Sequence, residues 1–210
     1  MNDSELPLLT APEARVLGCL IEKKETTPDV YPLSLNGAVA AANQKSSRDP
    51  VMTLEPGEVR HALTRLQEKG LARRSFASRV ERYEHLMPQR FSLTGGQIAL
   101  IGLMLLRGPQ TAHELLTRSE RMARYGSIED VKSDLDLMIG RRPPLVVHLE
   151  RGPGQREDRY THLLAGPVEA PPPRAATAVS RQASPDVEDR LRRLEERVAE
   201  LEAKLAGMAG

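Results

Sequence analysis

The chain has 210 residues, of which 40% are hydrophobic and 28% charged, and its formal net charge is only +1 at pH 7. These proportions are typical of a globular protein and exclude a membrane-embedded or strongly basic chain. The longest apolar run, residues 98–106, is too short to span a bilayer, and the N-terminus lacks the basic and apolar regions of a signal peptide. We therefore expect a cytoplasmic protein without membrane contact, in which any surface for nucleic acid is local.

Residues 11–25 predict a first helix with one wide apolar face, formed by Ala14, Val16, Leu17, Leu20 and Ile21. Arg15, Glu22 and Lys23 are expected outside that face. The single cysteine, Cys19, lies among apolar residues, so we expect a buried structural thiol, and no disulfide can form within the chain.

Two prolines, Pro28 and Pro32, favour an extended path over residues 26–33, which would bring Leu33 into a small sheet. Ser34 is expected to cap a second helix at 35–43. The sequence then becomes sharply polar and predicts an exposed turn before the next helix.

The next segment predicts a helix that leads into a two-stranded hairpin. The helix is expected to have Thr53 as its N-cap and Pro56 in its first turn, and to end at Gly70. Its buried stripe follows helical spacing: Val59, Ala62, Leu63 and Leu66. Two strands follow, at 71–76 and 80–86, and a polar turn at 77–79 connects them. A helix with such a hairpin is typical of the second half of a winged helix.

This unit occurs a second time. Three apolar residues of the helix recur 72 positions later as Val131, Leu135 and Met138. The end of the hairpin, 82–86, recurs with one change 77 positions later, and Leu17-Gly18 is matched 84 positions later by Ile101-Gly102. Offsets of this kind indicate a repeat, so the sequence predicts a tandem pair of winged helices.

In the second copy, an apolar helix is expected around residues 98–105 and to end at Gly108. Thr111 and Ser127 are expected to cap the two helices that follow. The predicted fold is mainly α with small β-wings, as tandem winged helix-turn-helix domains plus a C-terminal coiled-coil helix. We expect four segments: domain 1 at 1–88, domain 2 at 89–166, a flexible Pro/Ala-rich linker at 167–185 and the coiled coil at 186–208.

The coiled coil is predicted from heptad spacing of six apolar residues: Val187, Leu191, Leu194, Val198, Leu201 and Leu205. The g positions hold basic residues and the e positions acidic residues. This pattern favours a parallel dimer, in which Arg190 of one helix would pair with Glu195 of the other. The sequence is also compatible with a trimer or a tetramer. The alternative to any oligomer is that this helix folds back onto its own domains.

The chain resembles the YceH family of bacterial proteins over roughly residues 10–165. The resemblance is carried by EARVLGCLIEKKETTPDVYPLSLN at 13–36, NQKSSRDPVM at 43–52 and RVERYEH at 79–85. Ala42 and Ser47 depart from the family pattern, which commonly has Cys and Asn there. The resemblance implies two winged-helix domains and does not imply an activity, because a fold does not fix a function.

Catalytic signatures do not occur in the sequence. The five histidines show no metal-ligand spacing, and there is no phosphate-binding glycine loop, no GxSxG and no CxxC. We therefore expect no enzyme activity, no cofactor and no metal site. His85 and His162 recur in equivalent strands, and packing under the hairpins is the favoured interpretation for both.

Domain 1 carries the candidate residues for double-stranded DNA. The segment from Thr53 to Arg90 contains eight basic and five acidic residues, which gives it a regional charge of 8 − 5 = +3. In a winged helix the third helix enters the major groove and the hairpin reaches flanking phosphate. The candidates lie in the polar turn, the third helix and the hairpin: Asn43, Gln44, Lys45, Ser46, Arg48, Arg60, His61, Thr64, Arg65, Arg73, Arg74, Arg79 and Arg82.

The equivalent helix of domain 2 has one lysine, Lys132, against four acidic residues, so phosphate would repel it and we expect it to contact protein instead. We expect a regulatory dimer that binds DNA through domain 1. The alternative is an adaptor whose winged helices bind only proteins. A continuous positive strip over Lys45, Arg48, Arg60, Arg65 and the hairpin would favour DNA, whereas a strip broken by Glu55, Glu58 and Glu81 would favour the adaptor.

Overall fold

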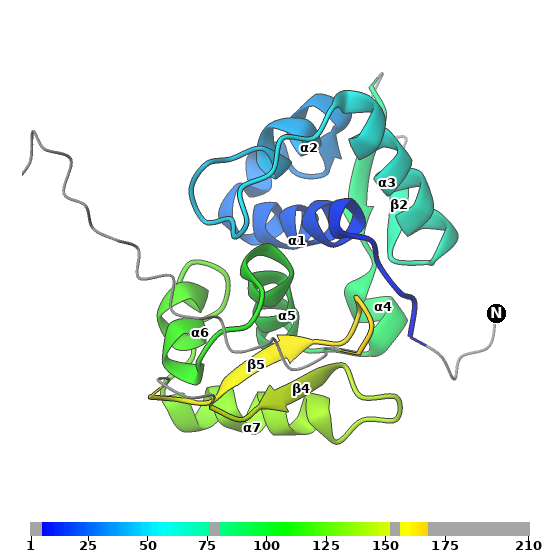
Figure 1. Cartoon of the computed structure of the whole chain (residues 1–210). Coiled ribbons are helices and arrows are strands. Elements are labelled where there is room, and N and C mark those ends of the chain that lie inside the picture. The colour runs from blue at the N-terminus through cyan, green and yellow to red at the C-terminus, as the bar shows by residue number, and fades with distance from the viewer. Residues whose placement is uncertain (1–5, 76–79, 152–155, 168–210) are drawn as a thin grey trace, which may run out of the picture. The chain divides into compact units, whose positions relative to one another are not determined.

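A computed structural model describes residues 6–75, 80–151 and 156–167. Residue contacts divide the chain into a unit of residues 1–170 and a unit of residues 171–210, and every described residue lies in the first. The described part is mainly helical, with two small antiparallel sheets (Figure 1). The linker and the predicted coiled coil lie outside the described residues.

The first half has the element order of a winged helix: α1 Ala11–Thr26, the 3-10 turn Pro28–Val30, β1 Leu33–Ser34, α2 Leu35–Ala42, α3 Pro56–Glu68, β2 Ala72–Ser75 and β3 Arg82–His85. The strands form an antiparallel sheet in the order β1-β3-β2, with Leu33 opposite Tyr83. The predicted stripe of α3 is confirmed, because Val59, Leu63 and Leu66 are fully buried. Gly70, at φ +68°, follows the end of the helix in a conformation that favours glycine.

Two local predictions for this half are wrong. The segment at 26–33 is not extended throughout, because a 3-10 turn forms at Pro28–Val30 before Leu33 joins the sheet. The N-cap of α3 is Glu55 rather than Thr53, since Glu55 and Glu58 form a reciprocal capping box. Ser34 caps α2 as predicted, and its hydroxyl accepts a hydrogen bond from the Gly37 amide.

The second half repeats this order: α4 Met87–Phe91, α5 Gly95–Arg107, α6 Ala112–Ser119, α7 Ile128–Ile139, β4 Val146–Leu149 and β5 Arg159–His162. An isolated bridge between Gln110 and Tyr160 occupies the place of β1. Thr111 and Ser127 cap α6 and α7 as predicted. The repeat stripe is confirmed too, with Val131, Leu135 and Met138 fully buried. The short helix α4 was not predicted.

The two halves meet where α1 crosses α5, and two glycines allow the close approach. A Cβ on Gly102 would lie 2.6 Å from Cγ2 of Ile21, and a Cβ on Gly18 would lie 2.8 Å from Cγ of Leu106 and 3.1 Å from Cβ of Leu105. Ile21 and Leu105, like Gly18 and Gly102, are related by the 84-residue repeat offset. The contact is therefore reciprocal, as in an isologous interface.

This crossing separates α3 from α7, the helix that corresponds to it in the second half. Figure 1 shows α3 on one side of the α1–α5 pair and α7 on the other. Within the described ranges, no helix combines the length and apolar character needed to cross a membrane.

Candidate nucleic-acid interface

The outward face of α3 carries four of the predicted residues. Burial of the opposite stripe leaves the side chains of Arg60, His61, Thr64 and Arg65 exposed to solvent. The hydroxyl of Thr64 donates to the Arg60 carbonyl at 3.1 Å. Arg65 forms an ion pair with Glu68 in the next turn, and it lies 3.9 Å from the buried Glu13. Arg60 has no hydrogen bond or ion pair from its side chain among the residues that the structure describes.

The hairpin β2–β3 does not present its arginines on one face. The register places Arg73 opposite Glu84 and Arg74 opposite Tyr83. Because neighbouring residues of a strand point to opposite faces, Arg73 and Arg74 lie on different sides of the hairpin. Tyr83 is buried, so Arg74 belongs to the face of the hairpin that is turned toward the core.

Each of these arginines has a carboxylate partner on β3 or just before it. Nε of Arg73 donates to Glu84 at 2.8 Å, and an Nη of Arg74 donates to Glu81 at 2.6 Å. The Tyr83 hydroxyl donates to the second oxygen of Glu81 at 3.1 Å. Burial and this bond raise the pKa of Tyr83.

Arg82 has a structural role that the sequence did not indicate. Its guanidinium donates to the carbonyls of Val30 at 3.3 Å and Pro32 at 2.8 Å. These bonds fasten the edge of the sheet next to β1, so Arg82 is removed from the candidate interface. Arg79 lies outside the described residues.

The polar turn after α2 divides into an exposed part and a structural part. Lys45 and Ser46 are exposed, as a phosphate contact requires. Asn43, in contrast, uses its whole amide on Leu54, accepting from the Leu54 amide at 2.8 Å and donating to the Leu54 carbonyl at 2.9 Å. The side-chain oxygen of Gln44 accepts from Arg48 at 3.0 Å. Asn43 therefore holds the turn in place, and Gln44 supports the turn through its side-chain oxygen on Arg48.

The prediction that Arg48 contacts DNA is wrong, because its side chain is fully buried. The guanidinium donates to both carboxylate oxygens of Glu22, at 2.7 and 3.1 Å, and to the carbonyl of Ala41 at 3.0 Å. Burial alone would raise the pKa of Glu22, but the hydrogen bond and the charge of Arg48 bring that pKa below its usual value. Arg48 is thus the centre of a buried network that fixes the turn onto α1 and α2.

Two further residues of α1 belong to this buried region. Arg15, expected in solvent, is only 2% exposed, because it donates to the carbonyls of Ala42 at 3.2 Å and Pro50 at 2.5 Å. The buried thiol of Cys19 is confirmed: it is fully inaccessible, and burial raises its pKa to about 11. A thiol in this state is unreactive.

The exposed basic surface is consequently narrower than the sequence predicted. It consists of the turn residues Lys45 and Ser46, the α3 residues Arg60, His61, Thr64 and Arg65, and the paired hairpin residues Arg73 and Arg74. Carboxylates interrupt it at Glu68, Glu81 and Glu84. Of the three carboxylates whose interruption would favour the adaptor, Glu81 pairs with Arg74, while Glu55 and Glu58 form the capping box of α3.

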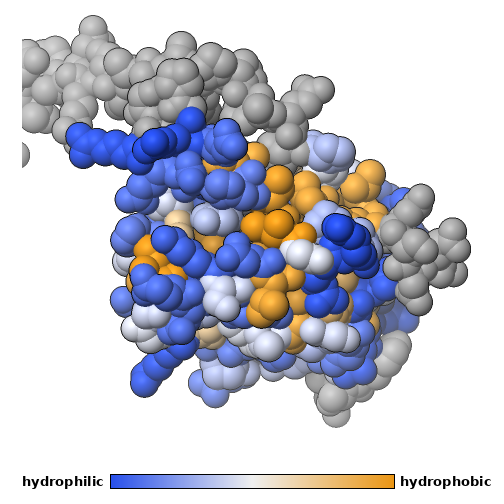
Figure 2. All heavy atoms as spheres, turned by 90° about the horizontal axis from the view of Figure 1, so that it is seen from below, coloured by the Kyte–Doolittle hydropathy of each residue, from blue (hydrophilic) through white to orange (hydrophobic). Residues whose placement is uncertain are grey.

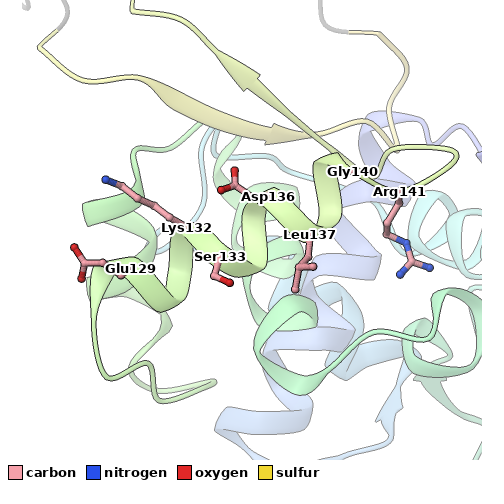
Figure 3. A pocket seen from close by; sticks show the side chains of 7 residues that line it. All are labelled: Glu129, Lys132, Ser133, Asp136, Leu137, Gly140 and Arg141. Atoms are coloured by element: carbon pink, nitrogen blue, oxygen red, sulfur yellow. The ribbon is translucent and has the colours of Figure 1, made fainter.

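The equivalent helix of the second half, α7, has a different surface. A shallow groove of about 660 Å³ runs along it, lined by Glu129, Lys132, Ser133, Asp136, Leu137, Gly140 and Arg141. In Figure 3, Lys132 and Asp136 project to one side of the helix and Ser133 and Leu137 to the other. Leu137 is 60% exposed. Figure 2, which views the molecule from the α7 side, shows apolar side chains gathered among polar ones on this face.

Comparison with known proteins places this chain among bacterial relatives. A family model with the description "Protein of unknown function, DUF480" matches residues 9–155. The chain is 64% identical to UPF0502 protein mll4256 of Mesorhizobium japonicum over 206 aligned residues. The aligned region covers 98% of this chain and 99% of the relative. It is 50% identical to UPF0502 protein xcc-b100_4348 of Xanthomonas campestris, over 96% of this chain and 93% of the relative. It is 48% identical to UPF0502 protein Smlt0097 of Stenotrophomonas maltophilia, over the full length of both.

Proposed function

The chain belongs to the DUF480 family, and from its own geometry we propose that it is a non-enzymatic regulatory protein that binds duplex DNA through α3. The proposal includes a tandem winged-helix architecture, supported by the repeated element order and by the reciprocal crossing at Gly18 and Gly102. Since α3 and α7 lie on opposite sides of that crossing, one straight duplex cannot meet both, and α3 alone is assigned to DNA.

The solvent face of α3 is the observation that carries this proposal. Arg60, His61, Thr64 and Arg65 offer cationic and hydrogen-bonding groups along one exposed helix face, while the opposite face is fixed in the core. Arginine pairs with guanine edges or phosphate, and threonine and histidine are hydrogen-bonding partners for base or backbone. Lys45 and Ser46 lie in the turn that precedes α3 and add phosphate contacts.

Charge reversal on α3 tests the proposal. The parent protein is expected to bind a duplex of about 20 base pairs at low salt, with an affinity that falls steeply as salt rises. The double variant Arg60→Glu/Arg65→Glu is expected to lose binding by about 100-fold or more, because attraction to phosphate becomes repulsion. Fluorescence anisotropy across a salt series measures both quantities.

The matched control is Arg121→Glu/Arg124→Glu, which changes the net charge equally at two exposed arginines of the second half. It is expected to reduce affinity only slightly, since those side chains lie away from α3. Equal losses in the two double variants would mean that only net charge matters, and the assignment of α3 would be abandoned. Absence of binding by the parent at low salt would reject DNA binding altogether.

A protein-binding adaptor is the second candidate function. It is supported by the interrupted basic strip of the first half and by the exposed Leu137 in the groove of α7. If the parent protein fails to bind DNA, this candidate takes precedence. The two functions are also compatible, with α3 on DNA and α7 on a protein.

The C-terminal heptads extend the proposal to a parallel dimer. A chain that ends near Ser180 is expected to be monomeric by light scattering, whereas the full chain is expected to be dimeric. DNA affinity should fall on truncation as well, because two tethered copies raise each other's effective concentration. A truncated chain that is still dimeric would show that the heptads do not cause dimerisation.

A further inference from the structure

Two of the four hairpin arginines, Arg73 and Arg74, form ion pairs with carboxylates of their own hairpin. Arg73 pairs with Glu84 directly across the strands, and Arg74 pairs with Glu81 diagonally. Glu81 is additionally held by the hydroxyl of Tyr83, a residue that is only 6% exposed. One partner in each pair is thus held in place by the sheet register or by a buried side chain, so a carboxylate offsets the charge that Arg73 and Arg74 would present to an approaching duplex.

We propose that Glu81 and Glu84 are specificity-determining residues, which keep Arg73 and Arg74 from binding DNA unless α3 is already seated in the groove. This inference rests on the proposed DNA binding through α3. On a non-specific duplex, a phosphate would have to displace the carboxylate from the arginine, and that carboxylate belongs to the same hairpin and stays close by. On a duplex that α3 holds, the phosphate is positioned beside the hairpin and the exchange becomes favourable.

The energies of the pairs fit this conditional role. Exposed ion pairs stabilise a fold only weakly, so they can be exchanged for pairs with phosphate. They still suppress binding in the absence of other contacts, because a like charge beside phosphate is repulsive and each phosphate contact contributes to the salt dependence of affinity. Arg74 shares a face of the hairpin with the buried Tyr83, whereas Arg73 lies on the other face.

The test uses the full chain with Glu81→Gln/Glu84→Gln and a duplex of random sequence. Glutamine keeps an oxygen for the Tyr83 hydroxyl, so the sheet is retained, and a thermal melt verifies this. The variant is expected to bind random duplex about 10-fold more tightly at low salt, with a slope of log K against log salt that is steeper by about two. The single variant Glu84→Gln, which removes the carboxylate partner of Arg73, is expected to steepen the slope by about one.

The control is Glu120→Gln/Glu129→Gln, which makes the same change in net charge at exposed residues of the second half. Selection from a random pool supplies the specificity measurement: the parent and the control should enrich a sequence, and the hairpin variant should enrich it less. Affinity, slope and enrichment equal to those of the control would overturn the role of Glu81 and Glu84 while leaving α3 binding intact. Absence of binding by the parent, the control and the hairpin variant alike would instead reject the proposed function.

Discussion

Replacing Arg48 with methionine is expected to lower the free energy of unfolding by about 3–5 kcal/mol, the usual cost of breaking a buried ion pair by removing one partner. The methionine fills much of the volume but leaves the carbonyl of Ala41 without the Arg48 donor and the carboxylate of Glu22 without its two strongest hydrogen bonds, with Lys23 at 3.5 Å as its remaining cation. An unpaired group in a buried site retains its full desolvation penalty. Urea denaturation of the variant and the parent measures the difference.

Lys45→Met, three residues earlier in the same turn, is the matched control, and it should change stability by no more than roughly 0.5 kcal/mol, because Lys45 is exposed. Labelling of Cys19 gives a second measurement, since Arg48 covers its sulfur at 3.5 Å. The thiol should label faster in the Arg48 variant than in the Lys45 variant. If the two variants unfold at the same urea concentration, the buried network does not stabilise the fold.

The same region shows where sequence reasoning was insufficient. A 3.6-residue period reports which face of a helix is apolar, so the buried stripes of α3 and α7 could be predicted from spacing alone. Arg15 and Arg48 could not be placed in this way, because burial of a charged side chain depends on carbonyls and carboxylates from distant segments. The polar turn containing Arg48 looked exposed since every residue in it is polar, yet one of them is the most buried group of the site.

The hairpin shows a second limit. Counting charges between Thr53 and Arg90 gave a net of +3, which is correct as a sum and does not say which charges face each other. The strand register decides that, and it places Glu84 on Arg73 and brings Glu81 to Arg74. The length of the turn sets the register, so a sequence in which the turn is uncertain cannot separate available arginines from paired ones.

Stability should fall steeply between about pH 6.5 and pH 4 because of His85 and His162. Both side chains are buried in equivalent strands, at 5% and 8% exposure. Burial lowers the pKa of each to about 4, and the charge of Lys24 contributes at His85. The unfolded chain has the ordinary value near 6.5 and binds protons first as the pH falls. The stabilisation is thus complete above about pH 6.5 and is lost as the pH falls to 4. The free energy of unfolding should fall by roughly 3 kcal/mol for each histidine over this interval.

Urea denaturation from pH 7.5 to pH 4 measures this loss. The double variant His85→Gln/His162→Gln should start less stable at pH 7.5, because glutamine fits the two buried sites less well, and its stability should vary much less with pH. His61→Gln, at an exposed position of α3, should keep the dependence of the parent. Carboxylates such as Glu22, whose pKa is below its usual value, add a loss that begins at lower pH and is common to all variants. A double variant as steep as the parent between pH 6.5 and pH 5 would therefore exclude the histidines, since few carboxylates titrate in that interval.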